Sequence, residues 1–285
     1  TGAPEESRDT VQAWIIVPKE TAEHQQPFDI NIYGHGYTGA FLEQILYAGS
    51  MAEHGLATVG INALGHQLVL GEFELTAAAG ILGSACYAPA FDGLTLGRAR
   101  DLNGDGVKDS GGDFWSSYLF HTRDGVRQSV LDHLQLVRIM RAFGQGTMQC
   151  RNDADPVAKV RACDFDADGT PDTLGDFDGD GTIDIGGPDT RMGTWGESLG
   201  GILSAIHGAI DASVTAAVPG SGGGGLTDIG VRSFQGGVIE AVLLRLWGPL
   251  LVGIPADERD PCGPGVEADD DCTLCAEEQI SVRWV

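Results

Sequence analysis

The stretch Trp195-Gly196-Glu197-Ser198-Leu199-Gly200-Gly201 carries the pattern Gly-x-Ser-x-Gly between two regular elements. The residues before it, 190–195, predict a strand, and residues 199–210 predict a helix. A serine at such a strand-to-helix turn is exposed at the carboxyl edge of a sheet, where it can act as a nucleophile. Glycines two residues to either side leave room for the tight turn. Because the chain has 43 glycines, the pattern also arises by chance, and Ser198 as an ordinary helix N-cap is the alternative.

Strands and helices alternate along the rest of the chain. Apolar runs predict further strands at 11–17, 28–33, 56–62 and 213–218, and helical spacing predicts helices at 41–54 and 125–143. Gly55 suits the left-handed position that ends a helix. This order indicates an α/β fold with a doubly wound, mostly parallel sheet.

The length of 285 residues fits one large α/β domain over 1–285 that carries two long insertions, 66–122 and 145–189. The net charge of −24 repels phosphate backbones and anionic membranes, so nucleic-acid binding is not expected. No transmembrane segment is expected either. The most apolar stretch, 236–255, is interrupted by charged residues, glycine and proline.

The insertions contain three copies of Asp-x-[Asp/Asn]-x-Asp-Gly-x-x-Asp, which begin at Asp101, Asp164 and Asp176. Oxygen ligands at positions 1, 3 and 5, glycine at 6, a backbone carbonyl at 7 and a carboxylate at 9 form a calcium loop. The sequence therefore predicts about three structural Ca²⁺ ions. The alternative is a set of solvated turns. The predicted ligands, in chain order, are Asp101, Asn103, Asp105, Val107, Asp109, Asp113, Asp164, Asp166, Asp168, Thr170, Asp172, Asp176, Asp178, Asp180, Thr182, Asp184 and Asp189.

These loops resemble the EF-hand-type loops of thrombospondin type 3 and dockerin repeats. They depart from a full EF-hand at position 12, which is Gly112, Gly175 or Gly187 where an EF-hand has glutamate.

The chain also resembles the α/β-hydrolase family over most of residues 11–220. The resemblance rests on the turn Gly34-His35-Gly36-Tyr37 after the second predicted strand, on Gly65-His66 after the third, and on the order of elements up to Ser198. It implies an α/β-hydrolase-like fold in which Ser198 is the nucleophile. It also implies that the backbone N–H groups of Tyr37 and Leu199 form the oxyanion hole.

The histidine of the family's catalytic triad has no clear counterpart. Only His207 follows Ser198, and it lies in the same predicted helix, where we expect it to be packed. Asp228 is a candidate for the acid, although aspartate in a glycine-rich loop is also a common turn residue. His35, which we expect to shape the oxyanion turn, and His66 and His121 all precede the serine. The family's last two strands also lack a counterpart, so we expect a domain incomplete at its C-terminus and a second polypeptide segment that supplies the base.

Six cysteines, with few basic residues, favour an oxidising setting and a secreted or cell-surface protein. Cys150 with Cys163 would close a short loop, while Cys272 and Cys275 have the spacing of a zinc site as the rival interpretation. Residues 220–255 pass from a glycine run into an apolar stretch. They suit a lid, a buried core segment or an interchain helix.

Together these features predict a secreted, calcium-stabilised serine esterase or lipase that acts on ester or lipid-like small molecules. A serine peptidase of the same fold is one alternative. The other is a catalytically inactive calcium-binding module of an adhesin or filament.

Overall fold

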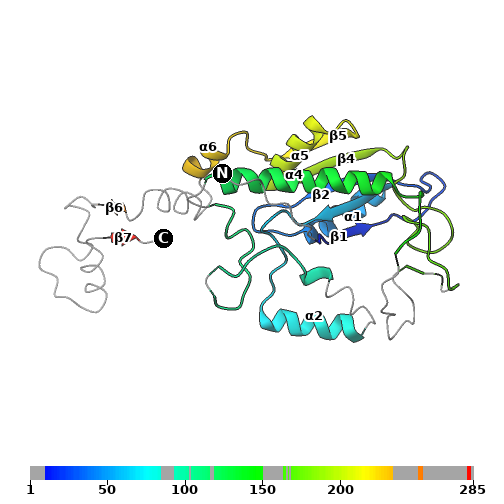
Figure 1. Ribbon diagram of the computed structural model, residues 1–285, viewed down its shortest axis with the longest axis horizontal. Helices are drawn as coiled ribbons and strands as arrows, with labels where there is room; N and C mark the ends of the chain where they lie inside the picture. Colours follow the sequence, from blue (N-terminus) through cyan, green and yellow to red (C-terminus); the bar gives the residue numbers. More distant parts are fainter. Residues whose placement is uncertain are drawn as a thin grey trace, which may run out of the picture. The chain divides into compact units, whose positions relative to one another are not determined.

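The computed structural model describes residues 10–84, 93–102, 104–115, 119–149, 163–164, 166, 168–233, 250–252 and 281–283. The chain divides into two compact units. One comprises Thr1–Phe114 and Arg123–Gly224, and the other comprises Trp115–Thr122 and Gly225–Val285. The first unit holds the large sheet (Figure 1). The second holds α6 (Leu226–Arg232) and a small antiparallel pair, β6 (Leu250–Val252) and β7 (Ser281–Arg283).

The large sheet has five strands in the order β1-β3-β2-β4-β5. Four of them run parallel: β3 (Leu56–Ile61), β2 (Asp29–Gly34), β4 (Met192–Glu197) and β5 (Val214–Gly220). Only β1 (Ala13–Ile16), at one edge, is antiparallel to its neighbour. The mixed, mostly parallel α/β sheet of the prediction is thus confirmed, and it fits an α/β-hydrolase-like fold.

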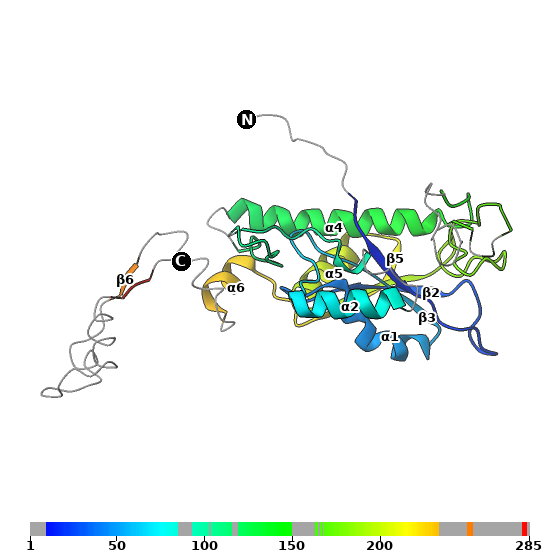
Figure 2. The same cartoon turned by 90° about the horizontal axis from the view of Figure 1, so that it is seen from below.

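Helices lie on both faces of this sheet, as a parallel sheet requires. On one face, Ile30 and Ile32 of β2 and Val59 of β3 pack in one apolar cluster with Val137 and Met140 of α4 (Leu119–Arg141). On the other face, Gly60 of β3 lies against the Gln44 side chain, at the end of the 3-10 helix η1 (Phe41–Gln44). The helix α1 (Ile45–Ala52) continues from η1 and contacts β3. Figure 2 shows α4 and α1 on opposite sides of the strands.

The remaining helix of the sheet's core is α5 (Leu199–Ile210), which packs on β4, β5 and β2. Its bounds are those predicted from the sequence. Gly55 follows α1 at a φ of 68°, which confirms the predicted left-handed end of that helix.

Two features differ from the sequence-based expectation. The first insertion contains a helix, α2 (Glu72–Ser84), that the sequence pattern did not predict. Its apolar residues are spread almost evenly around the helix, and Phe73 and Ile81 are exposed. The sequence of α2 therefore has no amphipathic pattern from which a helix could be predicted. The helix α4 begins at Leu119, six residues before its predicted start. Among the described residues, no helix is long and apolar enough to cross a bilayer.

Candidate active site

Ser198 occupies the turn between β4 and α5 in a strained conformation. Its φ is 57° and its ψ is −112°, one of three non-glycine residues with positive φ in the described part of the chain. Such a conformation costs of order 1–3 kcal/mol and is typical of functional positions. The side chain makes no capping hydrogen bond, although Ser198 stands at the N-cap position of α5. The structure therefore offers no support for the alternative in which Ser198 is an ordinary N-cap.

The turn is held by close backbone contacts at the carboxyl edge of the sheet. The Ser198 N–H donates to the Gly220 carbonyl at the end of β5, over 3.0 Å. Gly34 at the end of β2 is paired in register with Gly196 of β4. A Cβ on Gly196 would lie 2.5 Å from the Gly34 carbonyl oxygen, and a Cβ on Gly200 would overlap with that same atom. The end of β2, the end of β4 and the start of α5 thus lie in backbone contact, and only glycine fits at positions 196 and 200.

This crowding predicts a large difference between two helical glycines. We expect Gly200→Ala to destabilise the protein by about 3 kcal/mol or more, because neither the Gly34 backbone nor the helix has room to move. Gly49→Ala in α1 is the matched control, since Gly49 is exposed and a Cβ there meets no atom of the described residues within 4 Å. It should raise stability by up to about 1 kcal/mol. Urea unfolding of the two variants measures both values, and equal effects would contradict the packing described here.

The turn after β2, residues Gly34–Gly39, is called the oxyanion turn below. His35 is buried in it and makes two hydrogen bonds: its Nε2 accepts the Ala63 N–H over 2.9 Å, and its Nδ1 lies 2.8 Å from the Gly36 carbonyl oxygen. Because Nε2 accepts and Nδ1 donates, the imidazole is neutral. Burial lowers the pKa of His35 to about 4, which agrees with this state. His35 therefore shapes the turn, as the sequence suggested, and is not placed as a base.

The two expected oxyanion donors lie at the ends of adjacent strands. Leu199 is the first residue of α5, where a backbone N–H has no partner within the helix and is directed at the space before the helix. Tyr37 lies in the oxyanion turn, which leaves β2 directly beside the end of β4. The parallel register of β2 and β4 thus brings the turn and the serine to one edge of the sheet.

Six of the seven histidines lie in the first unit with Ser198. None of these six is placed as a partner of Ser198, whose hydroxyl makes no hydrogen bond among the described residues of that unit. His207 is completely buried in α5 and stacks on His133 of α4, with ring centroids 5.5 Å apart. Burial lowers the pKa of both, that of His133 to about 3. The expectation that His207 is a packed helical residue is confirmed.

His66 is likewise a buried residue of the oxyanion edge. It is 0% exposed, its Nδ1 lies 3.0 Å from the Leu64 carbonyl oxygen, and its ring packs against Tyr37 and Phe114. Burial, with a smaller effect of His35, lowers the pKa of His66 to about 4. It is a neutral packing residue of the first insertion.

Several further candidates belong to the second unit or lie outside the described residues. Asp228 is in the first turn of α6, 73% exposed at its side chain and 3.6 Å from Arg232. Residues 234–249 and 253–255 of the expected lid lie outside the described residues, as do the cysteines other than Cys163. Cys163 is fully buried and disulfide-bonded. His121 lies in α4, within the second unit.

The three acidic loops share one hydrogen-bond geometry. In each, the aspartate at position 1 accepts the N–H of the glycine at position 6, and that glycine has positive φ. The pairs are Asp101 with Gly106, Asp164 with Gly169 and Asp176 with Gly181, at 2.9, 3.2 and 2.9 Å. The aspartate at position 5 accepts the N–H of position 7: Asp105 from Val107, Asp168 from Thr170 and Asp180 from Thr182. Three separate segments therefore fold in the same way.

Two of the loops bring carboxylates together. One triad is Asp164, Asp166 and Asp168, the other is Asp176, Asp178 and Asp184, and within each the oxygens lie within 4.8 Å of one another. Asp164 is only 8% exposed, and its Oδ1 has no hydrogen-bond partner among the described residues. Asp172, Asp180 and Asp189 lie outside these triads. In the first loop Asn103 is outside the described residues, and Asp109 accepts the Leu102 N–H over 2.9 Å.

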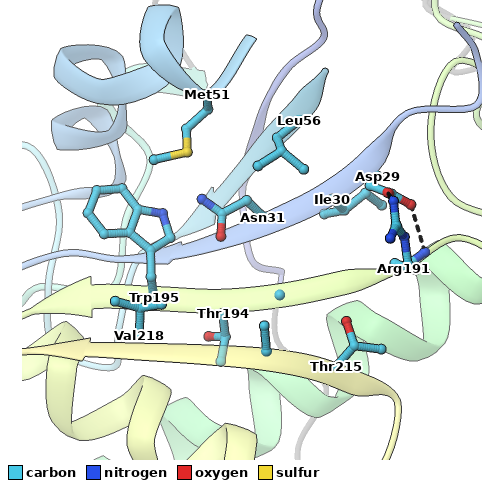
Figure 3. Close-up of a pocket in the computed structure, with 12 residues that line it drawn as sticks. Asp29, Ile30, Asn31, Met51, Leu56, Arg191, Thr194, Trp195, Thr215 and Val218 are labelled. Atoms are coloured by element: carbon cyan, nitrogen blue, oxygen red, sulfur yellow. Dashed lines mark hydrogen bonds and ion pairs between the residues drawn. The ribbon is translucent and has the colours of Figure 1, made fainter. Parts of the chain in front are cut away.

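A cavity of about 420 Å³ lies on the sheet near the amino ends of β2, β4 and β5. Trp195, Asn31 and Val218 line it beside Met51 of α1, as Figure 3 shows. The ion pair of Arg191 with Asp29, at 2.5 Å, marks its far end. Ser198 is not among the residues that line this cavity.

Comparisons with known proteins yield only slight likenesses. No family model and no curated protein matches the chain. Several solved structures resemble it. Three of them are 2,6-dihydroxy-pseudo-oxynicotine hydrolase (10% identity, TM-score 0.30), an acetyl xylan esterase from Paenibacillus sp. R4 (18%, 0.31) and Est1E from Butyrivibrio proteoclasticus with bound ferulic acid (26%, 0.17).

The matches cover 73%, 73% and 26% of this chain and span only 32%, 43% and 32% of those chains. Because TM-scores this low carry little weight, the function is proposed below from this chain's own residues.

Proposed function

We propose that the chain is the nucleophile-bearing part of a serine hydrolase that acts on carboxylic esters, including lipid-like ones. The observation that carries this proposal is the strained conformation of Ser198, with a φ of 57°, beside a turn held rigid by a neutral histidine. A protein retains strain of this kind where it exposes a reactive group.

In the proposed reaction the Ser198 hydroxyl attacks the ester carbonyl, and the backbone N–H groups of Leu199 and Tyr37 stabilise the oxyanion of the tetrahedral intermediate. An imidazole takes the serine proton and passes it to the leaving alcohol, which departs as the acyl-enzyme forms. Water then attacks the carbonyl of the acyl-enzyme, and the imidazole takes its proton and returns it to the Ser198 oxygen. The bond between Ser198 and the acyl group breaks, and the carboxylic acid is released.

The base comes from outside these 285 residues in this proposal. Six of the seven histidines share the first unit with Ser198, and none of these six bonds to Ser198 in the described part of that unit. A second polypeptide segment that reaches the carboxyl edge of the sheet is therefore the proposed partner. The chain alone is expected to hydrolyse esters poorly, since general-base catalysis contributes about 10²–10⁴-fold.

We further propose that the acidic loops bind about three structural Ca²⁺ ions. The support is the shared hydrogen-bond geometry of the loops and the buried Oδ1 of Asp164, which lacks a partner among the described residues. An isolated buried carboxylate oxygen is unfavourable unless a cation or a donor satisfies it. Calcium loops and at least one buried disulfide-bonded cysteine favour a secreted or cell-surface protein.

Labelling by a fluorophosphonate probe tests the hydrolase proposal. We expect the probe to modify Ser198 in the intact natural protein, identified by peptide mass spectrometry, and to be blocked by prior treatment with an ester substrate. The missing base within the described residues favours one second candidate, an inactive calcium-binding surface module. Absence of labelling in the intact natural protein would select that candidate and reject the enzyme.

A further inference from the structure

We propose that Glu43 is a positioning residue for the oxyanion turn, because one of its carboxylate oxygens holds both the turn and the strand that leads into it. This inference rests on the hydrolase function proposed above. Sequence reasoning did not single out Glu43, because no motif marks it.

The Glu43 carboxylate accepts two hydrogen bonds at the same oxygen. Oε2 accepts the Gly36 N–H over 3.0 Å and the Tyr33 hydroxyl over 3.0 Å. Hydrogen bonds to an ionised carboxylate are roughly twice as strong as neutral ones. Glu43 therefore connects Gly36, in the middle of the oxyanion turn, to Tyr33, near the end of β2.

The backbone that carries Glu43 is itself anchored. It belongs to η1, whose first residue, Phe41, donates its N–H to the buried Asn62 side chain over 2.9 Å. At the other end of η1, the Gln44 side chain donates to the Trp14 carbonyl over 3.3 Å. Because η1 is anchored at both ends, the Glu43 carboxylate is held in place independently of the oxyanion turn.

The two peptide units on either side of Gly36 are consequently both held. Glu43 holds the N–H of the unit before Gly36, and His35 with the Gly39 N–H holds the carbonyl of the unit after it. That second unit also carries the Tyr37 N–H, which points opposite to the carbonyl in a planar trans peptide. Because glycine rotates freely about φ and ψ, both anchors are needed to fix the direction of the Tyr37 N–H.

Tyr33 is suited to be the permanent second donor. Its side chain is 1% exposed and lies against Trp195 of β4, with ring centroids 4.8 Å apart. Burial, and secondarily the Glu43 charge, raise the pKa of the Tyr33 phenol, so it stays protonated and donates. The carboxylate therefore links the oxyanion turn to β2 and, through the contact of Tyr33 with Trp195, to β4, the strand that leads to Ser198.

The Glu43 carboxylate also packs closely against Gly39. A substitution at Gly39 can therefore displace the carboxylate by steric overlap, without a change of Glu43 itself. A Cβ on Gly39 would overlap with Glu43 Oε1, whereas a Cβ on Gly36 would come no closer than 3.9 Å to Oε2. Gly39→Ala is expected to expel the carboxylate. Gly36→Ala makes the same chemical change three residues away and is expected to leave it in place.

Amide hydrogen exchange of the whole 285-residue chain, followed by NMR, tests the holding role without need of catalysis. We expect Glu43→Ala and Gly39→Ala to accelerate exchange of the Gly36 amide about tenfold or more. Glu43→Gln keeps an acceptor oxygen of the same shape, so exchange should stay within a few-fold of the wild type, as in Gly36→Ala. Unchanged exchange in Glu43→Ala, with the fold intact by circular dichroism, overturns the proposal whether or not the protein hydrolyses esters.

Ester hydrolysis by the intact natural protein tests the positioning role. We expect Glu43→Ala to lower kcat about tenfold or more with little change in KM, since oxyanion stabilisation acts in the transition state. Glu43→Gln should recover most of the rate. Equal loss in both variants, or a change in KM alone, would overturn the positioning role. A different outcome would overturn the proposed function and leave the holding role of Glu43 intact. In that outcome Glu43→Ala accelerates exchange of the Gly36 amide, but the wild-type protein shows no chemistry at Ser198.

Discussion

Replacing Ser198 by alanine will abolish ester hydrolysis by the intact natural protein while leaving its fold unchanged. Loss of a serine nucleophile removes the covalent route, and the rate should fall by about a thousandfold or more. Turnover of a p-nitrophenyl ester measures this, with Ser50→Ala as the control, since Ser50 is an exposed residue of α1. Retained turnover in purified Ser198→Ala would reject Ser198 as the nucleophile.

The strain at Ser198 adds a second readout that does not depend on activity. A φ of 57° with a ψ of −112° suits glycine far better than alanine. We therefore expect Ser198→Gly to be more stable than Ser198→Ala by about 1 kcal/mol or more. Equal stability of the two variants would show that the turn relaxes to an ordinary conformation in solution.

Removal of calcium should lower the melting temperature by about 10 °C for each ion that the folded protein binds at 1,000 times its Kd. A ligand that binds only the folded state at 1,000 times its Kd stabilises by about 4 kcal/mol per site. For a chain of this size each kcal/mol corresponds to about 2–4 °C. Differential scanning calorimetry with and without EDTA measures the shift, and excess Ca²⁺ should restore the original value while Mg²⁺ should not.

Two aspartates make a matched pair for the same test. Asp176→Asn alters a buried member of a carboxylate triad, whereas Asp124→Asn alters an exposed aspartate of α4 that is not among the predicted ligands. Only the first should reduce the stabilisation by calcium. An unchanged melting temperature after EDTA, together with no bound metal by elemental analysis, would reject calcium binding in favour of solvated turns.

The parts of the structure that follow from local pattern could be predicted from sequence. The helix α5 has the predicted bounds because a glycine-flanked serine starts it and an apolar stripe continues it. The strands β2, β3 and β4 were located to within a few residues, because buried parallel strands read as apolar runs. The acidic loops were visible because their chemistry repeats at fixed spacing.

The parts that depend on tertiary contact could not be predicted. The in-register pairing of Gly34 with Gly196 is a property of the assembled sheet. Glu43 is an unremarkable helical glutamate until the chain folds and sets its carboxylate beside Gly36. The helix α2 has no amphipathic stripe, so no periodicity separated it from the insertion around it.

The strand β2 connects the third acidic loop at its amino end with the oxyanion turn at its carboxyl end. The Phe28 N–H, just before β2, donates to the carbonyl of Asp184 in the third acidic loop over 2.8 Å, while the other end of β2 leads into the oxyanion turn. Six residues of strand span about 20 Å, and over that separation two unit charges interact by only about 1 kcal/mol at an effective dielectric constant of about 20. The charge of an ion bound at Asp184 should therefore have little influence on Ser198. Activity measured across a calcium titration of this loop would thus report the folded fraction of the protein, with the intrinsic reactivity of the serine held constant.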